Sequence, residues 1–556
     1  MFIKGCDVYE YQLLLKHILN SGVNYAPNQE IVYRDLYRYT YRDLYERVCK
    51  LANALEELGV KNGTRIGVME WDSHRYLECY FAIPMLGAVL HTINVRLSAE
   101  TVAYTINHAE DEIILVNTDF LPLLDLIRKR LSVKRYILIK DSEKSLETDL
   151  TELEYEEMLR NSKSNYDFPE FDENTVATLF YTTGTTGDPK GVWFTHRQLV
   201  LHTLAAAVWV TGWRSNVRLK EEKEVYMPLT PMFHVHAWGY PYVATLLGLK
   251  QVYPGRYEPK KIVELILKEK VTFSHCVPTI LQMIIENLPT GIILDKWKVI
   301  VGGSKLPEGL AIKAKERGIK VTSGYGMSET CPKLLSAAFK PHLTDLSDDE
   351  KLKYCLKTGI PNPLVYVRVV NENFTDVKKN SKEMGEIIVR APWLTQGYLK
   401  DEIKTKELWA GGWLHTGDIA VVDEEGYVTI VDRLKDVIKS GGEWISSLAL
   451  ENLISMHPKV KEVAVIGKPH EKWGERPIAI IVPIENEKPS EEELRSFLMK
   501  LVEEGRITKW AIPDDFVIVD QIPKTSVGKI DKKMLRKMFS KQFYSEVVNK
   551  KSYDPS

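Results

Sequence analysis

The chain has 556 residues, of which 44% are hydrophobic and 27% are charged, so it is a globular protein too long for a single hydrophobic core. Its 74 Lys and Arg residues against 76 Asp and Glu residues leave a formal charge of −2, which argues against a sequence-independent nucleic-acid binder. The longest apolar runs, such as residues 80–90, are well short of the roughly 18 to 20 residues that cross a bilayer, so we expect no membrane span.

Two further features of the sequence concern the compartment. Residues 1–7 lack the charged and then apolar order of a signal peptide. The six cysteines lie far apart, without a Cys-x-x-Cys pair, which favours reduced thiols over disulfides or a zinc site. These two features predict a cytoplasmic protein. The small net charge predicts that it has no nucleic-acid partner.

The first third of the chain alternates helical and strand-like patterns. Residues 41–58 carry apolar side chains at helical spacing and end at Gly59, and a second helix is expected over 76–86. Short apolar runs predict three strands, over 65–69, 113–116 and 136–139. This alternation predicts an α/β sheet with crossover connections, followed by a solvated connection over 141–170.

A loop rich in glycine and threonine follows the apolar run 176–181. Residues 182–190 contain four threonines, two glycines and a lysine, which offer hydroxyls, backbone N–H groups and one cation to a polyanion. This composition predicts a phosphate loop, with an ordinary hairpin turn as the alternative. The P-loop of kinases and GTPases is excluded by register, because Pro189 stands where its second glycine belongs and Gly191, not Ser or Thr, follows Lys190.

A segment rich in histidine and aromatic residues, 227–239, begins as a strand and is expected to form a pocket wall. His234 and His236, two positions apart on a strand, would share a face and could both reach a metal ion. A zinc-type site would need a third ligand, which the neighbouring sequence does not supply, so we do not expect one.

Two glycine-rich turns follow further strand-like runs. The turn 302–304, Gly-Gly-Ser, comes directly after the apolar run 299–301 and would let the backbone approach a flat ligand. The stretch 323–330 places a tyrosine between two glycines, which suits stacking on a base. Ser328 and Glu329 follow it and offer oxygen ligands to a hard cation.

The last third of the chain holds three further motifs. They are Gly417-Asp418, the charged and glycine-rich stretch 432–446, and Gly528-Lys529. Strands are expected over 460–466 and 477–482, and a helix over 491–504. A small α+β domain fits the residues after about 434.

In this order, these motifs resemble the AMP-forming adenylating superfamily: acyl-CoA synthetases, firefly luciferase and the adenylation domains of peptide synthetases. Within it, 439–447 followed by 450–452 is similar to medium-chain fatty acid–CoA ligases and to archaeal 4-hydroxybutyrate– and 3-hydroxypropionate–CoA ligases. The resemblance implies a large N-terminal domain of mixed α/β sheets, 1–434, that binds ATP and the acid. It also implies a smaller, mobile α+β C-terminal domain, 435–556, that carries the adenylation lysine.

The resemblance further implies a two-step reaction. A carboxylate attacks the α-phosphate of ATP to give acyl-AMP and pyrophosphate, and the CoA thiol then displaces AMP. ATP and CoA are therefore co-substrates, with Mg²⁺ as cofactor. Two anions meet in the first step, so the site must supply cations.

Each motif receives a role from the resemblance. The catalytic residues are Lys529, Glu329 and His234, which would gate the acid's carboxylate, and Glu329 and Thr183 would bind the metal. The ATP-binding set comprises Thr182, Thr183, Gly184, Thr185, Thr186, Gly187, Lys190, Gly302, Gly303, Ser304, Gly324, Tyr325, Gly326, Met327, Ser328, Asp418 and Arg433. Phe233 and Trp238 would line the acyl pocket, Lys435 would be the hinge, and the CoA tunnel would be lined by Gly441, Gly442, Glu443 and Trp444.

The expected activity is that of an acid–CoA ligase for a short- or medium-chain acid, with a hydroxy acid such as 4-hydroxybutyrate among the candidates. The bulk of Trp238 favours a short pocket, unless the indole packs away from it. Three alternatives are an aryl-CoA ligase, a free-standing adenylation enzyme that charges a carrier protein, and a nucleotide-binding scaffold without catalysis. The sequence leaves association into a homodimer open.

Overall fold

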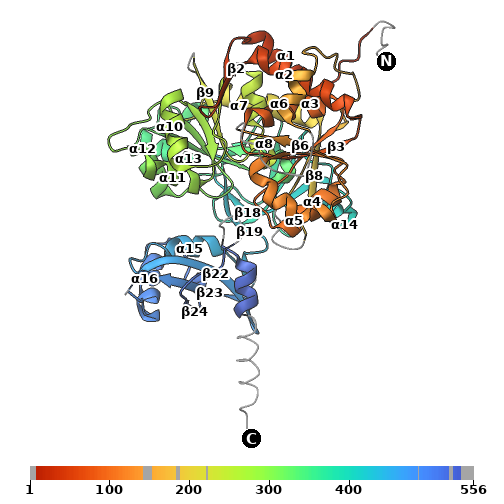
Figure 1. The fold of residues 1–556 in the computed structure, drawn as a ribbon. Helices are drawn as coiled ribbons and strands as arrows, with labels where there is room; N and C mark the ends of the chain where they lie inside the picture. Colours follow the sequence, from red (N-terminus) through yellow and green to blue (C-terminus); the bar gives the residue numbers. More distant parts are fainter. Residues whose placement is uncertain are drawn as a thin grey trace. The chain divides into compact units, whose positions relative to one another are not determined.

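The computed structural model describes residues 8–141, 153–182, 188–220, 223–441, 443–485, 487–524 and 530–539. The chain forms two compact units (Figure 1). The first comprises residues 1–367 and 389–414, and the second comprises residues 368–388 and 415–556. The first unit contains mixed α/β sheets, and the second unit is smaller. These two features confirm the predicted fold class.

The first unit contains a six-stranded sheet. Its strand order is β6 (Arg135–Ile139), β5 (Ile113–Asn117), β3 (Arg65–Met69), β4 (Val89–Thr92), β7 (Val176–Tyr181) and β8 (Gly191–Thr195). The sheet is parallel except for β8, which runs antiparallel to β7. The three strands predicted for the first third of the chain are therefore confirmed, as the cores of β3, β5 and β6.

The first unit also contains a nine-stranded sheet. Its order is β15 (Ile360–Pro361), β14 (Lys333–Ser336), β13 (Lys320–Gly326), β12 (Lys298–Val301), β11 (Phe273–Cys276), β9 (Val225–Leu229), β10 (Lys250–Tyr253), β1 (Glu30–Tyr33) and β2 (Tyr37–Thr40). The central strands, β13 to β1, are parallel, and β14, β15 and β2 are antiparallel to their neighbours. The carboxyl ends of β12 and β13 therefore meet at one edge, which is where ligands bind in open α/β sheets.

Helices cover both sheets of the first unit. They are α1 (Leu15–Tyr25), α2 (Tyr41–Glu57), α3 (His74–Met85), α4 (Ala99–Ala109), α5 (Leu121–Ile127), α6 (Tyr155–Asn161), α7 (His196–Gly212), α8 (Val235–Trp238), α9 (Tyr240–Leu246), α10 (Pro259–Glu269), α11 (Pro278–Asn287), α12 (Glu308–Glu316), α13 (Asp348–Cys355) and α14 (Glu402–Leu408). Figure 1 shows α10 to α13 grouped together, and an apolar core links α10, α11 and α12 to strands β9 to β13.

Helix α2 shows how the sequence pattern sets an element. Thr40 caps its N-terminus in a capping box with Asp43, and the apolar residues at helical spacing, Leu44, Val48 and Leu51 among them, are fully buried. The predicted helix over 41–58 is therefore confirmed. The helix expected over 76–86 begins two residues earlier, at His74, because the Ser73 hydroxyl caps it.

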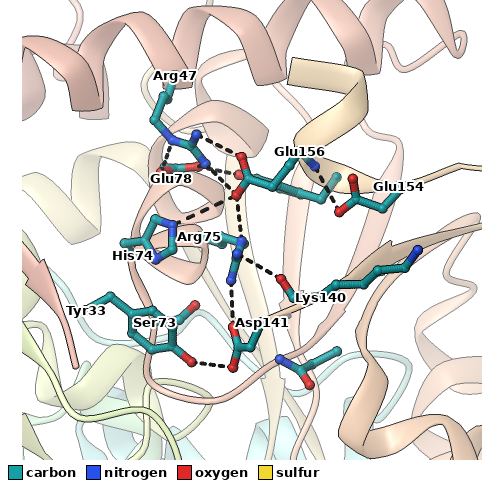
Figure 2. A network of polar contacts seen from close by, with 12 residues as sticks. Tyr33, Arg47, Ser73, His74, Arg75, Glu78, Lys140, Asp141, Glu154 and Glu156 are labelled. Atoms are coloured by element: carbon teal, nitrogen blue, oxygen red, sulfur yellow. Dashed lines mark hydrogen bonds and ion pairs between the residues drawn. The ribbon is translucent and has the colours of Figure 1, made fainter. Parts of the chain in front are cut away.

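A network of buried charges joins α2, α3 and α6 (Figure 2). The Arg47 guanidinium contacts Glu78 at 2.7 Å and Glu156 at 2.9 Å, and the Arg75 guanidinium contacts Glu156 at 2.7 Å and Asp141 at 2.9 Å. Each arginine thus lies between two carboxylates, as buried charges require. We assign this network a structural role, since all its described charges are paired.

The second unit holds two sheets. Most of a four-stranded sheet lies in it, in the order β16 (Tyr366–Val370), β17 (Gly385–Arg390), β18 (Leu414–Val422) and β19 (Val428–Arg433). A second sheet has the order β21 (Glu443–Ile445), β20 (Ile438–Ser440), β23 (Gly474–Pro483) and β22 (Val460–His470), with β24 (Asp515–Ile518) beside β23. Helices α15 (Ser447–Ile454) and α16 (Glu491–Glu503) pack on an apolar core of this sheet.

The compact units divide the chain at positions other than the predicted domain boundary between residues 434 and 435. Residues 415–434 belong to the second unit by their packing. The division into compact units does not test where the chain bends. The boundary between residues 434 and 435, with its hinge at Lys435, therefore stays a prediction.

Two further findings concern the helices and the cysteines of the described residues. None of the helices in the described ranges combines the length and apolar character needed to cross a membrane. The cysteines among these residues are all free and buried: Cys49, Cys79, Cys276, Cys331 and Cys355.

Candidate active site

The predicted phosphate loop lies in a β-hairpin. Strands β7 and β8 pair antiparallel with Tyr181 opposite Gly191, and the Thr182 N–H donates to the Lys190 carbonyl at 2.9 Å. The chain therefore reverses direction between Thr182 and Lys190. Most of the predicted phosphate contacts, 183–187, lie outside the described residues.

A chain of contacts joins this hairpin to the predicted metal ligand. The Lys190 Nζ lies 4.5 Å from the centre of the Tyr398 ring, and the Tyr398 hydroxyl donates to Glu329 Oε1 at 2.7 Å. Burial, with Glu329 as a second cause, raises the pKa of Tyr398 well above its ordinary value, so the phenol stays a neutral donor. The structure thus brings together Lys190 and Glu329, which lie far apart in the sequence.

Sequence reasoning missed Tyr398 and the segment around it. The Leu399 N–H donates to the Gly191 carbonyl at 2.8 Å, so this segment runs beside β8. The Thr395 N–H donates to the Glu329 carbonyl at 3.0 Å, and its hydroxyl donates to the Trp193 carbonyl at 3.0 Å. Glu329 is therefore held through its backbone and its side chain. The Gly-Tyr pair at 397–398 is too common a pattern to have drawn attention to this segment.

The residues around Glu329 fit a magnesium ion. Mg²⁺ takes oxygen ligands and is usually held by one or two carboxylates together with substrate phosphates. Glu329 supplies a buried carboxylate beside the phosphate hairpin, and Thr183, the second predicted ligand, lies outside the described residues. No cluster of three or more His, Cys, Asp or Glu side chains suited to a metal occurs in the described ranges.

The two glycine-rich turns meet at the carboxyl ends of β12 and β13. Val301 pairs with Ser323, so Gly302 lies beside Gly324. A Cβ atom on Gly302 would lie 2.8 Å from the Gly324 carbonyl oxygen, and one on Gly326 would lie 1.7 Å from the Pro332 carbonyl oxygen. Both positions therefore require glycine. Tyr325, between the two glycines of β13, is half-buried, and Gly303 and Ser304 are exposed.

Three side chains fix the backbone just before His234. The Met232 N–H donates to Asp72 Oδ1 at 2.8 Å, and the Tyr80 hydroxyl donates to the Met232 carbonyl. The Thr92 hydroxyl donates to the Phe233 carbonyl at 2.9 Å. The main chain that carries Phe233 and His234 is thus anchored to α3 and β4.

Helix α8 is a left-handed turn. Val235, His236, Ala237 and Trp238 have φ angles of +46°, +55°, +47° and +58°. A left-handed conformation costs an L-residue about 1–2 kcal/mol, so this turn depends on the packing around it. The buried His236 ring supplies part of that packing, with Phe180 at 5.4 Å and Tyr80 at 5.9 Å between ring centres.

The expectation that His234 and His236 share one face of a strand is wrong. His234 is exposed, whereas His236 is fully buried, and burial lowers its pKa to about 3. The left-handed turn separates the two rings, so they do not form a pair of metal ligands. His234, the predicted gate, lies just before the turn and is accessible.

The turn also places Trp238 against the first glycine-rich turn. A Cβ atom on Gly302 would lie 3.0 Å from the indole Cη2, and one on Gly303 would lie 3.9 Å from Cζ2. The centre of the indole ring lies 5.2 Å from the His275 ring centre. The indole therefore fills the space beside Gly302, where the acyl pocket is predicted. Phe233 is buried next to His234.

The second unit contains the predicted ribose residues. Asp418 on β18 pairs with Arg433 on β19, and the Arg433 Nε lies 2.7 Å from Asp418 Oδ1. The Asp418 side chain is 4% exposed and that of Arg433 is 54% exposed. The Asp418 N–H donates to the Thr416 hydroxyl at 3.2 Å, a contact within β18. The structure thus brings these two predicted residues together.

The predicted CoA residues lie in a hairpin of β20 and β21. Gly441 turns the hairpin with φ +59°, and its N–H donates to the Trp473 carbonyl at 2.8 Å. Lys439 Nζ lies 5.2 Å from the Trp444 ring centre, and Glu443 and Lys435 are exposed. Gly442 and Lys529 lie outside the described residues.

Two family matches cover the chain. The AMP-binding enzyme family matches residues 20–399, and the AMP-binding enzyme C-terminal domain matches residues 449–529. The chain therefore belongs to the AMP-binding enzyme family. This confirms the predicted family and enzyme class, an AMP-forming acid–thiol ligase that uses ATP, Mg²⁺ and CoA.

Individual relatives agree over nearly the whole chain. It is 45% identical to a long-chain fatty acid–CoA ligase of Thermus thermophilus, over 96% of this chain and 96% of the relative. It is 33% identical to a medium-chain fatty acid–CoA ligase of Ectopseudomonas oleovorans, over 95% of this chain and 96% of the relative. A solved anthranilate–CoA ligase has the same fold, with a TM-score of 0.78 at 24% identity, over 96% of this chain and 99% of that one.

Proposed function

We propose that this chain joins a short- or medium-chain carboxylic acid to CoA, by way of an acyl-AMP formed from ATP. The observation that carries the proposal is the contact chain from Lys190 through Tyr398 to Glu329, because it sets a cation and a buried carboxylate beside a phosphate-type hairpin. A carboxylate next to a phosphate site suits a metal ion that bridges to phosphate oxygens.

The residues divide the first step between them. Lys190 and the loop before it would hold the leaving pyrophosphate, and Glu329 would hold Mg²⁺, which would supply positive charge to the phosphates. Asp418, a buried carboxylate, would accept hydrogen bonds from the ribose hydroxyls. Lys529 would bridge the acid's carboxylate and the α-phosphate. These residues stabilise charge, and none of them needs to transfer a proton.

The second step needs a rearrangement, because Lys529 must leave before CoA enters. We place the hinge at Lys435, so that Gly441 and its neighbours then line the path of the pantetheine chain. Hinges are residues at element ends that absorb backbone rotation, and Lys435 is the second residue after the end of β19.

Replacing Lys529 with alanine tests this division of labour. Acyl-AMP formation, measured as pyrophosphate release, is expected to be lost, while thioester formation from supplied acyl-AMP and CoA is retained. A lysine that acts only on the adenylate step gives this split. Equal loss of both half-reactions would contradict the two-state assignment.

The acid is proposed to be short or medium in length, with a hydroxy acid such as 4-hydroxybutyrate among the candidates. The position of the Trp238 indole against Gly302 supports a short pocket. Trp238→Gly should shift the preference toward longer acids, by several-fold in kcat/KM per added pair of methylenes. An unchanged chain-length profile would remove Trp238 from the pocket wall.

A carboxylate panel tests the activity as a whole. Acids from C2 to C12, their hydroxy derivatives and benzoates would be scored for CoA-dependent AMP release and for free acyl-CoA. A CoA ligase releases free acyl-CoA. An enzyme that charges a carrier protein also exchanges pyrophosphate but releases no free acyl-CoA. Preference for benzoates would favour the aryl-CoA ligase alternative, and absence of pyrophosphate exchange would favour the non-catalytic scaffold.

We place this activity in the cytoplasm, which the free, buried cysteines of the described ranges support. A homodimer, which the sequence left open, is tested by the mass of the protein in solution.

A further inference from the structure

Lys333, at the start of β14, is a buried lysine in an aromatic box. The residue is 6% exposed. Its Nζ donates to the Tyr240 hydroxyl at 2.7 Å and lies 3.3 Å from the centre of the Trp209 ring. The position therefore pairs a lysine head with one hydroxyl and one aromatic face, far from bulk solvent.

These partners leave the lysine head incompletely satisfied. The Nζ has two N–H donors as a neutral amine and three when protonated, and among the described residues the Tyr240 oxygen is its one hydrogen-bond acceptor. No described carboxylate forms an ion pair with it. Burying such a head is costly, and burial lowers the pKa of Lys333 well below its ordinary value. An oxygen acceptor brought to this head would offset the cost.

Lys298, on β12 of the same sheet, shows what a purely structural buried lysine has. Its side chain is 2% exposed, and its Nζ contacts Glu224 at 2.5 Å. Lys298 thus has a carboxylate partner within the fold, and Lys333 has none in the described part of the chain. The difference points to a partner for Lys333 that is not among the described residues of this unit.

A stack of rings connects Lys333 to the predicted acyl pocket. The Tyr240 ring stacks on His275 with centres 5.0 Å apart, and His275 faces Trp238 at 5.2 Å. Trp238 lies against Gly302, as described above. Lys333 also pairs with Gly326 across β13 and β14, and Gly326 belongs to the stretch that ends in Glu329. Lys333 therefore lies opposite Gly326 of the glycine-rich stretch and is linked to Trp238 through Tyr240 and His275.

We propose that Lys333 determines the class of acid that this enzyme takes: an acid whose far end carries a hydrogen-bond acceptor oxygen, as a hydroxyl, carbonyl or second carboxylate. The inference rests on the proposed function. A terminal oxygen would accept from the Lys333 head, whereas a methyl end would leave its donors unsatisfied. Sites built to bind a polar group reject the analogue that lacks it far more strongly than apolar pockets reject an added methylene.

The test compares acids of equal length and different ends: butyrate, 4-hydroxybutyrate and succinate, each scored by pyrophosphate release. The wild-type enzyme is expected to favour an oxygen-ended acid over butyrate by about tenfold or more in kcat/KM. Lys333→Met keeps the length of the side chain without its donors and should bring that ratio to about one or below. The hydroxyl and carboxylate arms show which oxygen is preferred.

Two variants separate recognition from folding. Lys298→Met removes the other buried lysine, and should lower the melting temperature while leaving the ratio between acids as in the wild type. Tyr240→Phe keeps the ring but removes the hydroxyl that accepts from Lys333. The preference for oxygen-ended acids over butyrate should therefore persist in this variant. A Lys333→Met protein that melts as the wild type does makes its ratio a direct readout of recognition.

Three results would overturn the inference. The wild-type enzyme could use butyrate as well as its oxygen-ended analogues, Lys333→Met could keep the wild-type ratio, or Lys298→Met could change the ratio as much as Lys333→Met does. Failure of the proposed function looks different, because then no acid supports pyrophosphate release or acyl-CoA formation in the wild-type enzyme.

Discussion

Two buried carboxylates of this protein, one in each compact unit, are held by partners of different charge. Glu329 accepts a hydrogen bond from the neutral Tyr398 hydroxyl at 2.7 Å, whereas Asp418 forms an ion pair with Arg433 at 2.7 Å. The tyrosine contact itself brings no positive charge to Glu329. The arginine offsets the charge of Asp418 and leaves it an acceptor for neutral hydroxyls. The two partners thus suit a metal ligand and a ribose ligand.

Glu329→Gln tests the metal half of this comparison and carries the largest expected effect. The amide keeps the shape and an acceptor for Tyr398 but loses the charge, so acyl-AMP formation should fall by about a thousandfold, or about 4 kcal/mol of transition-state stabilisation. Pyrophosphate release over a range of Mg²⁺ concentrations measures it.

Tyr398→Phe is the matched control for Glu329→Gln. It removes one hydrogen bond and no charge, so a loss of only about tenfold is expected. Equal losses in the two variants would show that Glu329 acts through its hydrogen bond and not through its charge.

Asp418→Asn tests the ribose half. The amide keeps one acceptor oxygen but loses the charge that strengthens hydrogen bonds from both ribose hydroxyls, so the KM for ATP should rise by about a hundredfold, or about 3 kcal/mol. The KM for the acid should stay near its wild-type value. 2′-Deoxy-ATP provides the control, because the variant should discriminate less against it than the wild type does. A raised KM for the acid alone would contradict the assignment.

The elements with a local cause were predictable from the sequence. Helix α2 was expected over 41–58 and spans Tyr41–Glu57, because apolar spacing and the Thr40 cap are properties of neighbouring residues. The close backbone approach at the two glycine-rich turns was also predictable, because the glycines that permit it are visible in the sequence. Their close backbone approaches, such as that of Gly326 to the Pro332 carbonyl, leave no room for a side chain.

Features that depend on distant packing were not predictable. The left-handed turn from Val235 to Trp238 opposes the preference of every residue in it, so no local pattern indicates it. The Tyr398 hydroxyl meets Glu329 across 69 positions of sequence, and a tyrosine after a glycine is too common to signal that contact. Lys333 was missed because a lysine in a strand is usually read as solvent-exposed.

A third buried carboxylate, Asp72, tests the same comparison through the stability of the protein and not through its activity. Like Glu329 it receives hydrogen bonds from neutral donors, the Met232 N–H at 2.8 Å and the Tyr257 hydroxyl at 2.9 Å. Burial raises the pKa of Asp72 from 3.8 to about 7 despite these bonds and despite the nearby Arg96. Asp35, by contrast, contacts Lys261 and Lys268, whose hydrogen bonds lower its pKa to about 2.

The raised pKa of Asp72 sets the direction of a pH effect. Between pH 3.8 and about 7 the folded protein holds a proton on Asp72 that the unfolded chain has released, so the free energy of unfolding falls as the pH rises through this window. Asp72→Asn cannot titrate but keeps an acceptor for Met232. Its free energy of unfolding should therefore rise relative to that of the wild type by about 3 kcal/mol between pH 5 and pH 8, as measured by urea unfolding. Asp35→Asn should show no such change over this range, since the carboxyl of Asp35 is ionised throughout it. A flat difference for Asp72→Asn would mean that neutral donors hold a buried carboxylate ionised as well as lysines do, and the contrast between Glu329 and Asp418 would lose its basis.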